Sequence, residues 1–361
     1  MRWPWQRSRS ANQWVLSWSG QVLAYVHAKG LADGTFQVLS IGMEAQGPDD
    51  QAAFVKRLQG LGLKGAQATI MLRSEQYQLL QIDTPAVPPE ELRSAARYQV
   101  REMLQTHVDD VTIDVMRVGD GQHKGSGHSF VVAATNQVVK EVLDLASAAG
   151  CEVSVIDIQE SAQRNLQTAL TQRDGTLQRA NAALILDDAH QAVLTIAANE
   201  ELFYTRRFDL PEGFLSGTWG QSIEVAAPVD GFTPVEEYVP SYGGSASPYG
   251  QDYSGSPQSQ FAGAGGASAD DERSQRLVVE IQRSLDVWDR TWSSLPLNGL
   301  RVFAGDRSDE LAQWLTQQLG QSVTALDVGA LFAGFDAASP ADQALCMPLL
   351  GVLLRTEGSA Q

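Results

Sequence analysis

The sequence has few cysteines, few basic residues and no long apolar run. Its two cysteines, Cys151 and Cys346, lack the paired spacing of a disulfide framework or of a four-cysteine zinc site. No stretch approaches the roughly 20 apolar residues that a membrane-spanning helix needs. We therefore expect a cytoplasmic protein with reduced thiols and no transmembrane segment.

Basic residues are outnumbered by acidic ones. The chain carries 26 Lys and Arg against 43 Asp and Glu, which gives a formal net charge of -17 over 361 residues. Binding to nucleic acid draws its affinity from clustered Lys and Arg. This composition excludes a general nucleic-acid binder and favours a partner with a basic segment.

Three common catalytic motifs are also missing. A P-loop needs a glycine-rich turn that ends in Gly-Lys-Ser or Gly-Lys-Thr, and no such sequence occurs. "GSGHS" does not fit the Gly-x-Ser-x-Gly frame of a serine hydrolase. "GAGGAS" at 263–268 looks like a dinucleotide-binding turn, but it lies in a low-complexity stretch with no strand before it.

The first half of the chain alternates between strand and helix patterns. Residues 13–20, 21–30 and 35–42 read as a meander of three strands, and 49–63 as an amphipathic helix. Further on, a helix at 87–105 precedes two strands, a helix that ends at Gly150 and another strand. These patterns predict first-lobe strands and helix over 11–84 and an inserted α/β subdomain over 85–157.

The second half repeats the pattern with an interruption. We expect a connecting helix over 158–180, second-lobe strands over 181–220, and the rest of the second lobe with a C-terminal helix over 272–357. Between them, 221–271 is rich in Gly, Ser, Pro and Tyr and has almost no aliphatic residues. Such a segment buries too little apolar surface to order, so it predicts a disordered insertion. The fold class is α/β, with two lobes built on mixed sheets.

The segment "LDDAHQAVLTI" places two carboxylates and an imidazole on the turn of a hairpin. Asp187, Asp188 and His190 are residue types that bind metals, and together they could serve a metal-dependent hydrolase. The alternative is structural, since aspartate tolerates turn geometry and accepts hydrogen bonds from local backbone N–H groups. The pattern alone leaves both interpretations open.

The order of several segments resembles the actin-like proteins of pilus and secretion machines. "YQLLQIDTPAVPPEELRSAARYQVREML" resembles MSHA-type (MshI) pilus biogenesis proteins and the related PilM and GspL cytoplasmic domains. "EIQRSLDVW", "RVFAGDRSDELAQWL" and "PLLGVLLR" resemble three later segments of PilM. The resemblance covers nearly the whole chain except the insertion. It implies a two-lobed actin-like ATPase (ribonuclease H-like) fold with an inserted small subdomain.

The resemblance also implies where a nucleotide would bind. Actin-like ATPases hold phosphate on two hairpin turns, each with an aspartate followed shortly by a glycine. In the first turn Ser17 and Ser19 stand where the aspartate and glycine are expected, next to Gly20. The second turn keeps Asp187, followed by Asp188, but has Ala189 in place of glycine.

On the adenosine side, Gly305 remains while Ala304 replaces its neighbour. The resemblance therefore implies a vestigial nucleotide site, no catalytic residues, and no bound metal or cofactor. It implies a cytoplasmic scaffold, peripheral to the inner membrane, that binds the tail of a PilN-like bitopic protein and contacts the pilus motor ATPase. The alternative within the same machinery is a protein that still binds or hydrolyses ATP with magnesium.

Overall fold

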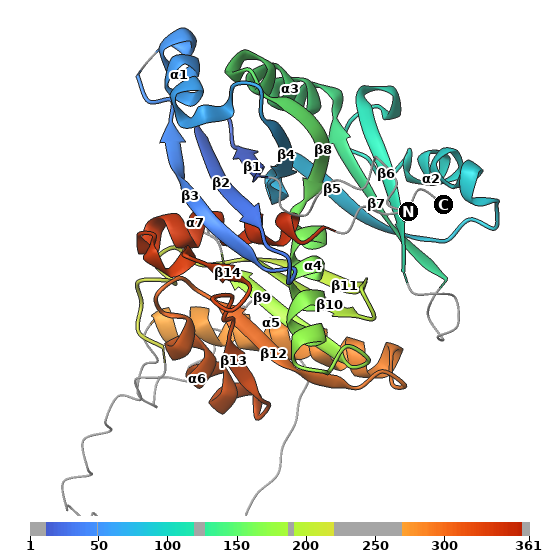
Figure 1. Ribbon diagram of the computed structural model, residues 1–361. Helices are drawn as coiled ribbons and strands as arrows, with labels where there is room; N and C mark the ends of the chain where they lie inside the picture. Colours follow the sequence, from blue (N-terminus) through green and yellow to red (C-terminus); the bar gives the residue numbers. More distant parts are fainter. Residues whose placement is uncertain (1–11, 49, 119–126, 187–190, 220–268, 356–361) are drawn as a thin grey trace, which may run out of the picture.

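The computed structural model describes residues 12–48, 50–118, 127–186, 191–219 and 269–355. These residues form three β-sheets with helices between and around them, as Figure 1 shows. The strands are β1 (Asn12–Trp18), β2 (Val22–Gly30), β3 (Phe36–Ala45), β4 (Gln67–Leu72), β5 (Tyr77–Asp83), β6 (Val111–Arg117), β7 (His128–Thr135), β8 (Glu152–Ile158), β9 (Ala180–Leu186), β10 (Gln191–Ala198), β11 (Glu201–Asp209), β12 (Leu297–Phe303), β13 (Val323–Ala325) and β14 (Phe332–Ala333). The α-helices are α1 (Gln51–Leu58), α2 (Leu92–Val100), α3 (Asn136–Ala149), α4 (Gln159–Arg173), α5 (Ala269–Thr291), α6 (Ser308–Leu319) and α7 (Pro340–Leu353).

The first lobe is built on a six-stranded sheet of order β14-β3-β2-β1-β4-β8. Strands β1, β2 and β3 form the predicted antiparallel meander. Because side chains alternate along a strand, Leu16 packs on the outer face under α1 and α3, while Val15 packs on the inner face. Asp50 caps α1 by accepting a hydrogen bond from the N–H of Ala53 at 2.7 Å.

A separate three-stranded sheet of order β5-β7-β6, together with α2, forms the small subdomain. Its boundaries differ from the predicted 85–157. The sheet begins earlier, at Tyr77, because β5 pairs with β7. At the other end, α3 packs on the outer face of the first-lobe sheet and β8 pairs in parallel with β4. The sheet that a strand joins depends on a distant partner, which the local pattern does not reveal.

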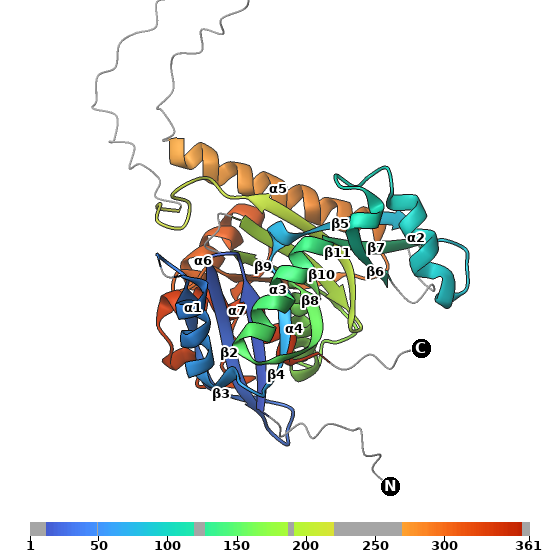
Figure 2. The same cartoon turned by 90° about the horizontal axis from the view of Figure 1, so that it is seen from above.

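The second lobe has a five-stranded sheet of order β11-β10-β9-β12-β13. β9 and β10 form the predicted hairpin, with Leu186 opposite Ala192. An apolar stripe of α5, with Leu277, Ile281, Leu285 and Trp288, is buried against the outer face of this sheet, beside α6. Figure 2 shows α5 running alongside β11. Trp288, Trp292 and Trp314 are buried in this core, with exposures of 5% or less.

Helices α4 and α7 lie between the two large sheets. The layers are therefore α1 and α3, the first-lobe sheet, α4 and α7, the second-lobe sheet, and α5 and α6 (Figure 1). The two middle helices pack closely at Gly351, where an added Cβ would lie 1.9 Å from the carbonyl oxygen of Ala162. Only glycine permits this approach of the two backbones.

The chain returns to the first lobe near its C-terminal end. β14 pairs in parallel with β3, and the rings of Phe332 and Phe36 stack at 5.8 Å between centroids. Helix α7 packs on the inner face of the first-lobe sheet, where it buries Cys346. The predicted unit 272–357 is thus divided, since β14 and α7 complete the first lobe rather than the second.

The predicted insertion over 221–271 lies outside the described residues, except that α5 already begins at Ala269. Over the ranges that the structure describes, no helix is both long enough and apolar enough to cross a membrane. Neither cysteine forms a disulfide, and both are buried.

Candidate functional site

Three of the predicted site residues lie at the carboxyl end of β1, where the inner face of the first lobe meets the middle helices. Ser17 is 0% exposed, and its Oγ has no hydrogen-bond partner. The N–H and Oγ of Ser19 both donate to the carbonyl of Val22, at 3.1 and 3.3 Å, which closes the turn to β2. Gly20 adopts a φ of 89°, a value that glycine takes without strain.

The second predicted turn lies outside the described residues. Asp187 and Asp188, together with His190, fall in this gap between β9 and β10. Gln191, the first residue of β10, accepts a hydrogen bond through Oε1 from the Oγ of Ser74 at 2.6 Å. This bond joins the second-lobe hairpin to the segment that follows β4.

Gly305, the third predicted element, occupies the turn between β12 and α6. Its φ is 62°, and a Cβ at this position would lie 3.8 Å from the Cβ of Ala344 on α7. Ser308 holds the turn, since its Oγ donates to the carbonyl of Gly305 and accepts from the N–H of Ala304. The structure thus brings Gly305 to α7, the same helix that packs beneath β1.

The described part of this site offers little to a magnesium ion. Mg²⁺ is held in proteins mainly by carboxylates and water, and Ser17 supplies only a neutral hydroxyl. In the described ranges no group of three or more His, Cys, Asp or Glu residues is arranged to hold a metal. The metal-ligand hypothesis for Asp187, Asp188 and His190 falls outside these ranges.

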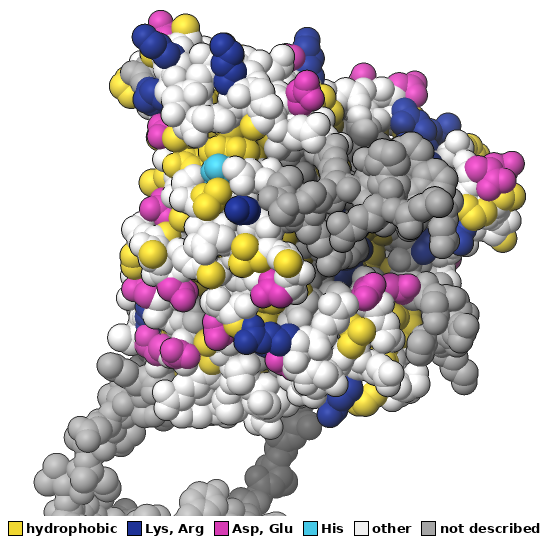
Figure 3. Space-filling view, in the orientation of Figure 1, with side chains coloured by type: hydrophobic (Ala, Val, Ile, Leu, Met, Phe, Trp, Pro, Cys, Tyr) yellow, Lys and Arg dark blue, Asp and Glu magenta, His cyan; other side chains and the backbone are white. Residues whose placement is uncertain are grey.

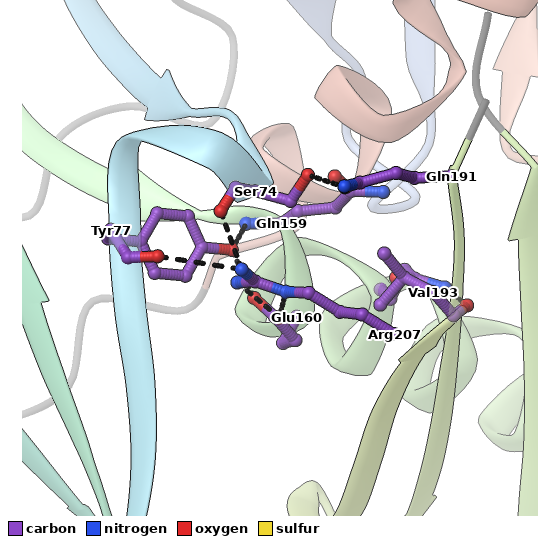
Figure 4. A network of polar contacts seen from close by, with 8 residues as sticks. Ser74, Tyr77, Gln159, Glu160, Gln191, Val193 and Arg207 are labelled. Carbon is purple, nitrogen blue, oxygen red and sulfur yellow. Dashed lines mark hydrogen bonds and ion pairs between the residues drawn. The ribbon is translucent and has the colours of Figure 1, made fainter. Parts of the chain in front are cut away.

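A polar network joins the lobes beside this site, and Figure 4 shows its geometry. Glu160, in the first turn of α4, is 0% exposed. Arg207 of β11 donates two hydrogen bonds to its Oε1, from Nε at 3.0 Å and Nη2 at 2.8 Å. Tyr77 of β5 donates its hydroxyl to Oε2 of the same carboxylate. Arg207 also donates to the carbonyl of Ser74 at 2.5 Å.

The network fixes the protonation states of its members. Burial, reinforced by the negative charge of Glu160, raises the pKa of Tyr77 well above its ordinary value, so the phenol stays protonated. Burial opposes the charge of Arg207, but Tyr77 and Glu160 outweigh it and raise the pKa of the guanidinium. The guanidinium also lies 4.5 Å from the centroid of the Tyr77 ring. We call Tyr77, Glu160 and Arg207 the inter-lobe network.

Helix α4 continues the polar contact with the second lobe along its length. Gln163 donates to the carbonyl of Val193 at 3.1 Å. One turn later Gln167 donates to the carbonyl of Asn181 at 2.6 Å and accepts from the hydroxyl of Thr195 at 2.9 Å. These buried amides bind β9 and β10 by hydrogen bonds in place of apolar packing. Each requires its partner, because an unpaired buried amide is costly.

The sequence-based prediction identified α4 as a connecting helix but missed the network. A signal was present in "IQESAQRNLQTAL", where Gln159, Gln163 and Gln167 recur every four residues on one face. A polar stripe at helical spacing on a helix expected between two lobes indicates buried hydrogen bonds. Neither Arg207 nor Tyr77 carried any local signal, since both come from other sheets.

Comparison with known proteins finds similarity at the level of structure. No family model matches the sequence, and no curated protein matches it either. A chain of a PilM–PilN type IV pilus biogenesis complex matches 96% of this chain and 100% of its own length, with a TM-score of 0.63 and 15% identity. The chain has the actin-like ATPase fold.

Two further structures are similar at lower scores. The cytoplasmic domain of EpsL, an inner membrane component of the type II secretion system of Vibrio cholerae, matches over 55% of this chain and 71% of its own, with a TM-score of 0.40 and 13% identity. A protein of unknown function with an actin-like ATPase fold from Bacteroides thetaiotaomicron matches over 96% of this chain and 97% of its own, with a TM-score of 0.47 and 9% identity. The predicted fold class is confirmed.

Proposed function

We propose that this protein is a cytoplasmic scaffold subunit of a type IV pilus assembly platform, of the MSHA type. It binds the cytoplasmic tail of a PilN-like inner-membrane protein and contacts the motor ATPase and other platform subunits. The observation that carries the proposal is the structural match to a chain of the PilM–PilN complex, which extends over that chain's whole length. The residues quoted from the four PilM-like segments support the same reading.

Loss of ATP hydrolysis is part of the proposal. The β1 turn has a buried neutral Ser17 where the resemblance requires a carboxylate to order magnesium-bound water. The inter-lobe network ties both lobes to α4 through a fully buried carboxylate. A site with this composition suits a rigid binding scaffold better than a cycle of cleavage and release.

We place the tail on the first lobe at helix α3. Beneath this helix the core is closed and apolar, with Leu58 of α1 and Leu145 of α3 both buried, so the tail would contact the exposed side of α3. The exposed residues of α3 include the acidic Glu141 and Asp144, the apolar Leu143 and one base, Lys140. A short peptide with basic and apolar residues would lie along this exposed helix surface, where its charges complement Glu141 and Asp144. On the face seen in Figure 3, Lys and Arg are dispersed among acidic side chains.

The test is a calorimetric titration of the full-length protein with a synthetic peptide of the tail. The double variant Glu141→Lys/Asp144→Lys should weaken binding by about tenfold or more, because it replaces attraction by like-charge repulsion. The matched control is Asp286→Lys/Asp289→Lys on α5, which also flanks an exposed apolar residue, Val287. Equal effects of the two variants would place the tail elsewhere.

Ionic strength provides an independent check on the same complex. Because screening shortens the reach of surface charges to roughly 8 Å at physiological ionic strength, we expect affinity for a basic tail to fall steadily between about 50 and 500 mM salt. Co-purification with candidate membrane subunits then tests the platform assignment. Failure to retain any PilN-like protein would count against the scaffold role.

The second candidate function is an actin-like protein that binds ATP with magnesium. Gly305 favours it, since this turn keeps its glycine and lies against α7. Calorimetry with magnesium-ATP separates the two functions. Micromolar binding that is abolished by Asp187→Ala would overturn our preference for a scaffold without catalysis.

A further inference from the structure

The outer side of the second lobe has a hollow at the C-terminal end of α5. Its volume is about 380 Å³, and it lies where the end of α5 meets the start of β12 and the turn between α6 and β13. Ligand pockets in proteins typically have volumes of about 300–1,000 Å³. Leu297 lines the hollow at the first residue of β12, whereas Gly305 follows the other end of that strand. The hollow is therefore separate from the predicted nucleotide site.

The floor of this hollow is apolar. Leu285 and Trp292 line it and belong to the second-lobe core, where they are 1% and 4% exposed. Leu297 is half-buried beside them, and Pro296 is exposed. A floor of this kind favours an apolar group, because contact removes apolar surface of both partners from water.

The rim of the hollow is polar and carries one charged side chain. Asp289 and Ser293 are exposed, Gln321 is half-buried, and all three line the hollow. Asp289 forms no ion pair with any described residue, and the neighbouring base Arg290 does not line the hollow. A free carboxylate beside a hydroxyl and an amide oxygen offers acceptors only to a group with several N–H donors. Such a rim favours a cation over a neutral ligand.

The end of α5 adds to the negative potential at this rim. The last carbonyl groups of a helix have no N–H partner within the helix. No described backbone N–H outside α5 donates to the carbonyls of Asp289, Arg290 or Thr291. These carbonyls give the helix end a partial negative charge, which disfavours a carboxylate in the last turn and favours a cation there. Asp289 therefore lowers the stability of α5 unless a cation binds beside it.

We propose that this hollow binds a primary ammonium group that is attached to an apolar chain. The ammonium lies at the rim, where it donates hydrogen bonds to the carboxylate of Asp289 and to the oxygens of Ser293 and Gln321. The apolar chain covers Leu285 and Trp292 on the floor. A free alkylamine presents this chemistry, and so does a peptide with an apolar N-terminal residue. The net charge of -17 attracts either of them to the protein.

The test follows the indole N–H signal of Trp292 by NMR in full-length protein with isotope-labelled tryptophan. The signal is assigned by its loss in the Trp292→Phe variant. The probes are hexylamine and its uncharged analogue hexanol, and a short leucine-initiated peptide with a free or an acetylated N-terminus. We expect hexylamine, the free peptide or both to shift the signal saturably, with a dissociation constant on the order of 1 mM. Hexanol and the acetylated peptide should bind about tenfold more weakly or worse.

Two variants locate the ammonium. Asp289→Asn should weaken binding of hexylamine by about tenfold or more, the factor that follows from loss of one charged hydrogen bond. The matched control is Asp286→Asn, because Asp286 accepts from Gln282 and does not line the hollow. This control should leave binding unchanged. Equal binding of hexanol and hexylamine, full binding to Asp289→Asn, or no binding to the unaltered protein would each overturn the proposal.

The melting temperature gives a second readout. Without a ligand, Asp289→Asn should melt at the same temperature as the unaltered protein or higher, because it removes a carboxylate from the negative end of α5. A lower melting temperature would show that Asp289 stabilises the fold, and would overturn its role as a free acceptor. The tail is proposed to bind at α3, in the outer layer opposite α5 (Figure 1), so Asp289→Asn should leave tail affinity unchanged. Failure of this site is thus distinguishable from failure of the scaffold proposal.

Discussion

Arg207 and Glu160 form a doubly hydrogen-bonded ion pair that joins the second lobe to helix α4. Two N–H groups of Arg207 reach one oxygen of Glu160, at 3.0 and 2.8 Å, while Tyr77 reaches the other. The carboxylate is 0% exposed. Because its three hydrogen bonds come from the second-lobe sheet and from the sheet of the small subdomain, this residue holds these two parts together against α4.

Replacing Arg207 should therefore lower the free energy of unfolding substantially. Arg207→Ala leaves a buried carboxylate without its counter-ion, and breaking a buried pair in this way costs about 3–5 kcal/mol. The matched control is Arg206→Ala, since Arg206 pairs with Glu280 at a partly exposed position where such pairs contribute about 0–1 kcal/mol. Urea denaturation measures both losses. Similar free energies of unfolding for the two variants would contradict the role assigned to Glu160.

The crossing of α4 and α7 depends on one glycine. Gly351→Ala would place a Cβ 1.9 Å from the carbonyl oxygen of Ala162, so the helices must separate. Overpacking of this kind costs about 1–3 kcal/mol or more. Gly60→Ala serves as the control, because an added Cβ there meets nothing within 4 Å. Thermal unfolding should show a clear loss for the first variant only.

Both thiols should be unreactive in the folded protein. Cys346 is 0% exposed, and burial raises its pKa to about 12. Burial also raises the pKa of Cys151. Since the thiolate is the reacting species, a thiol reagent at pH 8 should label neither residue until denaturant is added. Rapid labelling of the native protein would show that the α7 contact opens readily.

Stability should decline at alkaline pH. The pKa of Tyr77 and that of Cys346 are both raised by burial above the ordinary values of 10.0 and 9.0. The unfolded chain therefore loses these protons first as pH rises above about 9. This ionisation lowers the free energy of the unfolded state and so reduces the free energy of unfolding. Each group can contribute up to about 1.4 kcal/mol per pH unit.

This pH dependence can be assigned to a residue. Denaturation of the Tyr77→Phe variant between pH 8 and 11 should show a shallower decline than the unaltered protein, because one titrating group is gone. The variant is also expected to be less stable at pH 8, since Glu160 loses a hydrogen bond. An unchanged slope would mean that Tyr77 ionises in the folded state.

Local patterns in the sequence determined most elements of the fold. The meander of β1 to β3, the hairpin of β9 and β10, and the stripe of α5 follow from alternation and helical spacing. The helix expected over 87–105 is present but ends at Val100. The cap of α3 at Gly150, with a φ of 84°, was readable because only glycine takes that conformation easily.

Tertiary structure decided which sheet each strand joined and which polar residues met. β8 and β14 complete the first-lobe sheet although each lies far along the chain from its partner. Glu160, Arg207 and Tyr77 come from α4 and from two separate sheets. The spacing of apolar residues indicates which positions are buried, because one face of a helix or strand is buried along its whole length. It does not record the partner, because that contact forms only when distant segments pack.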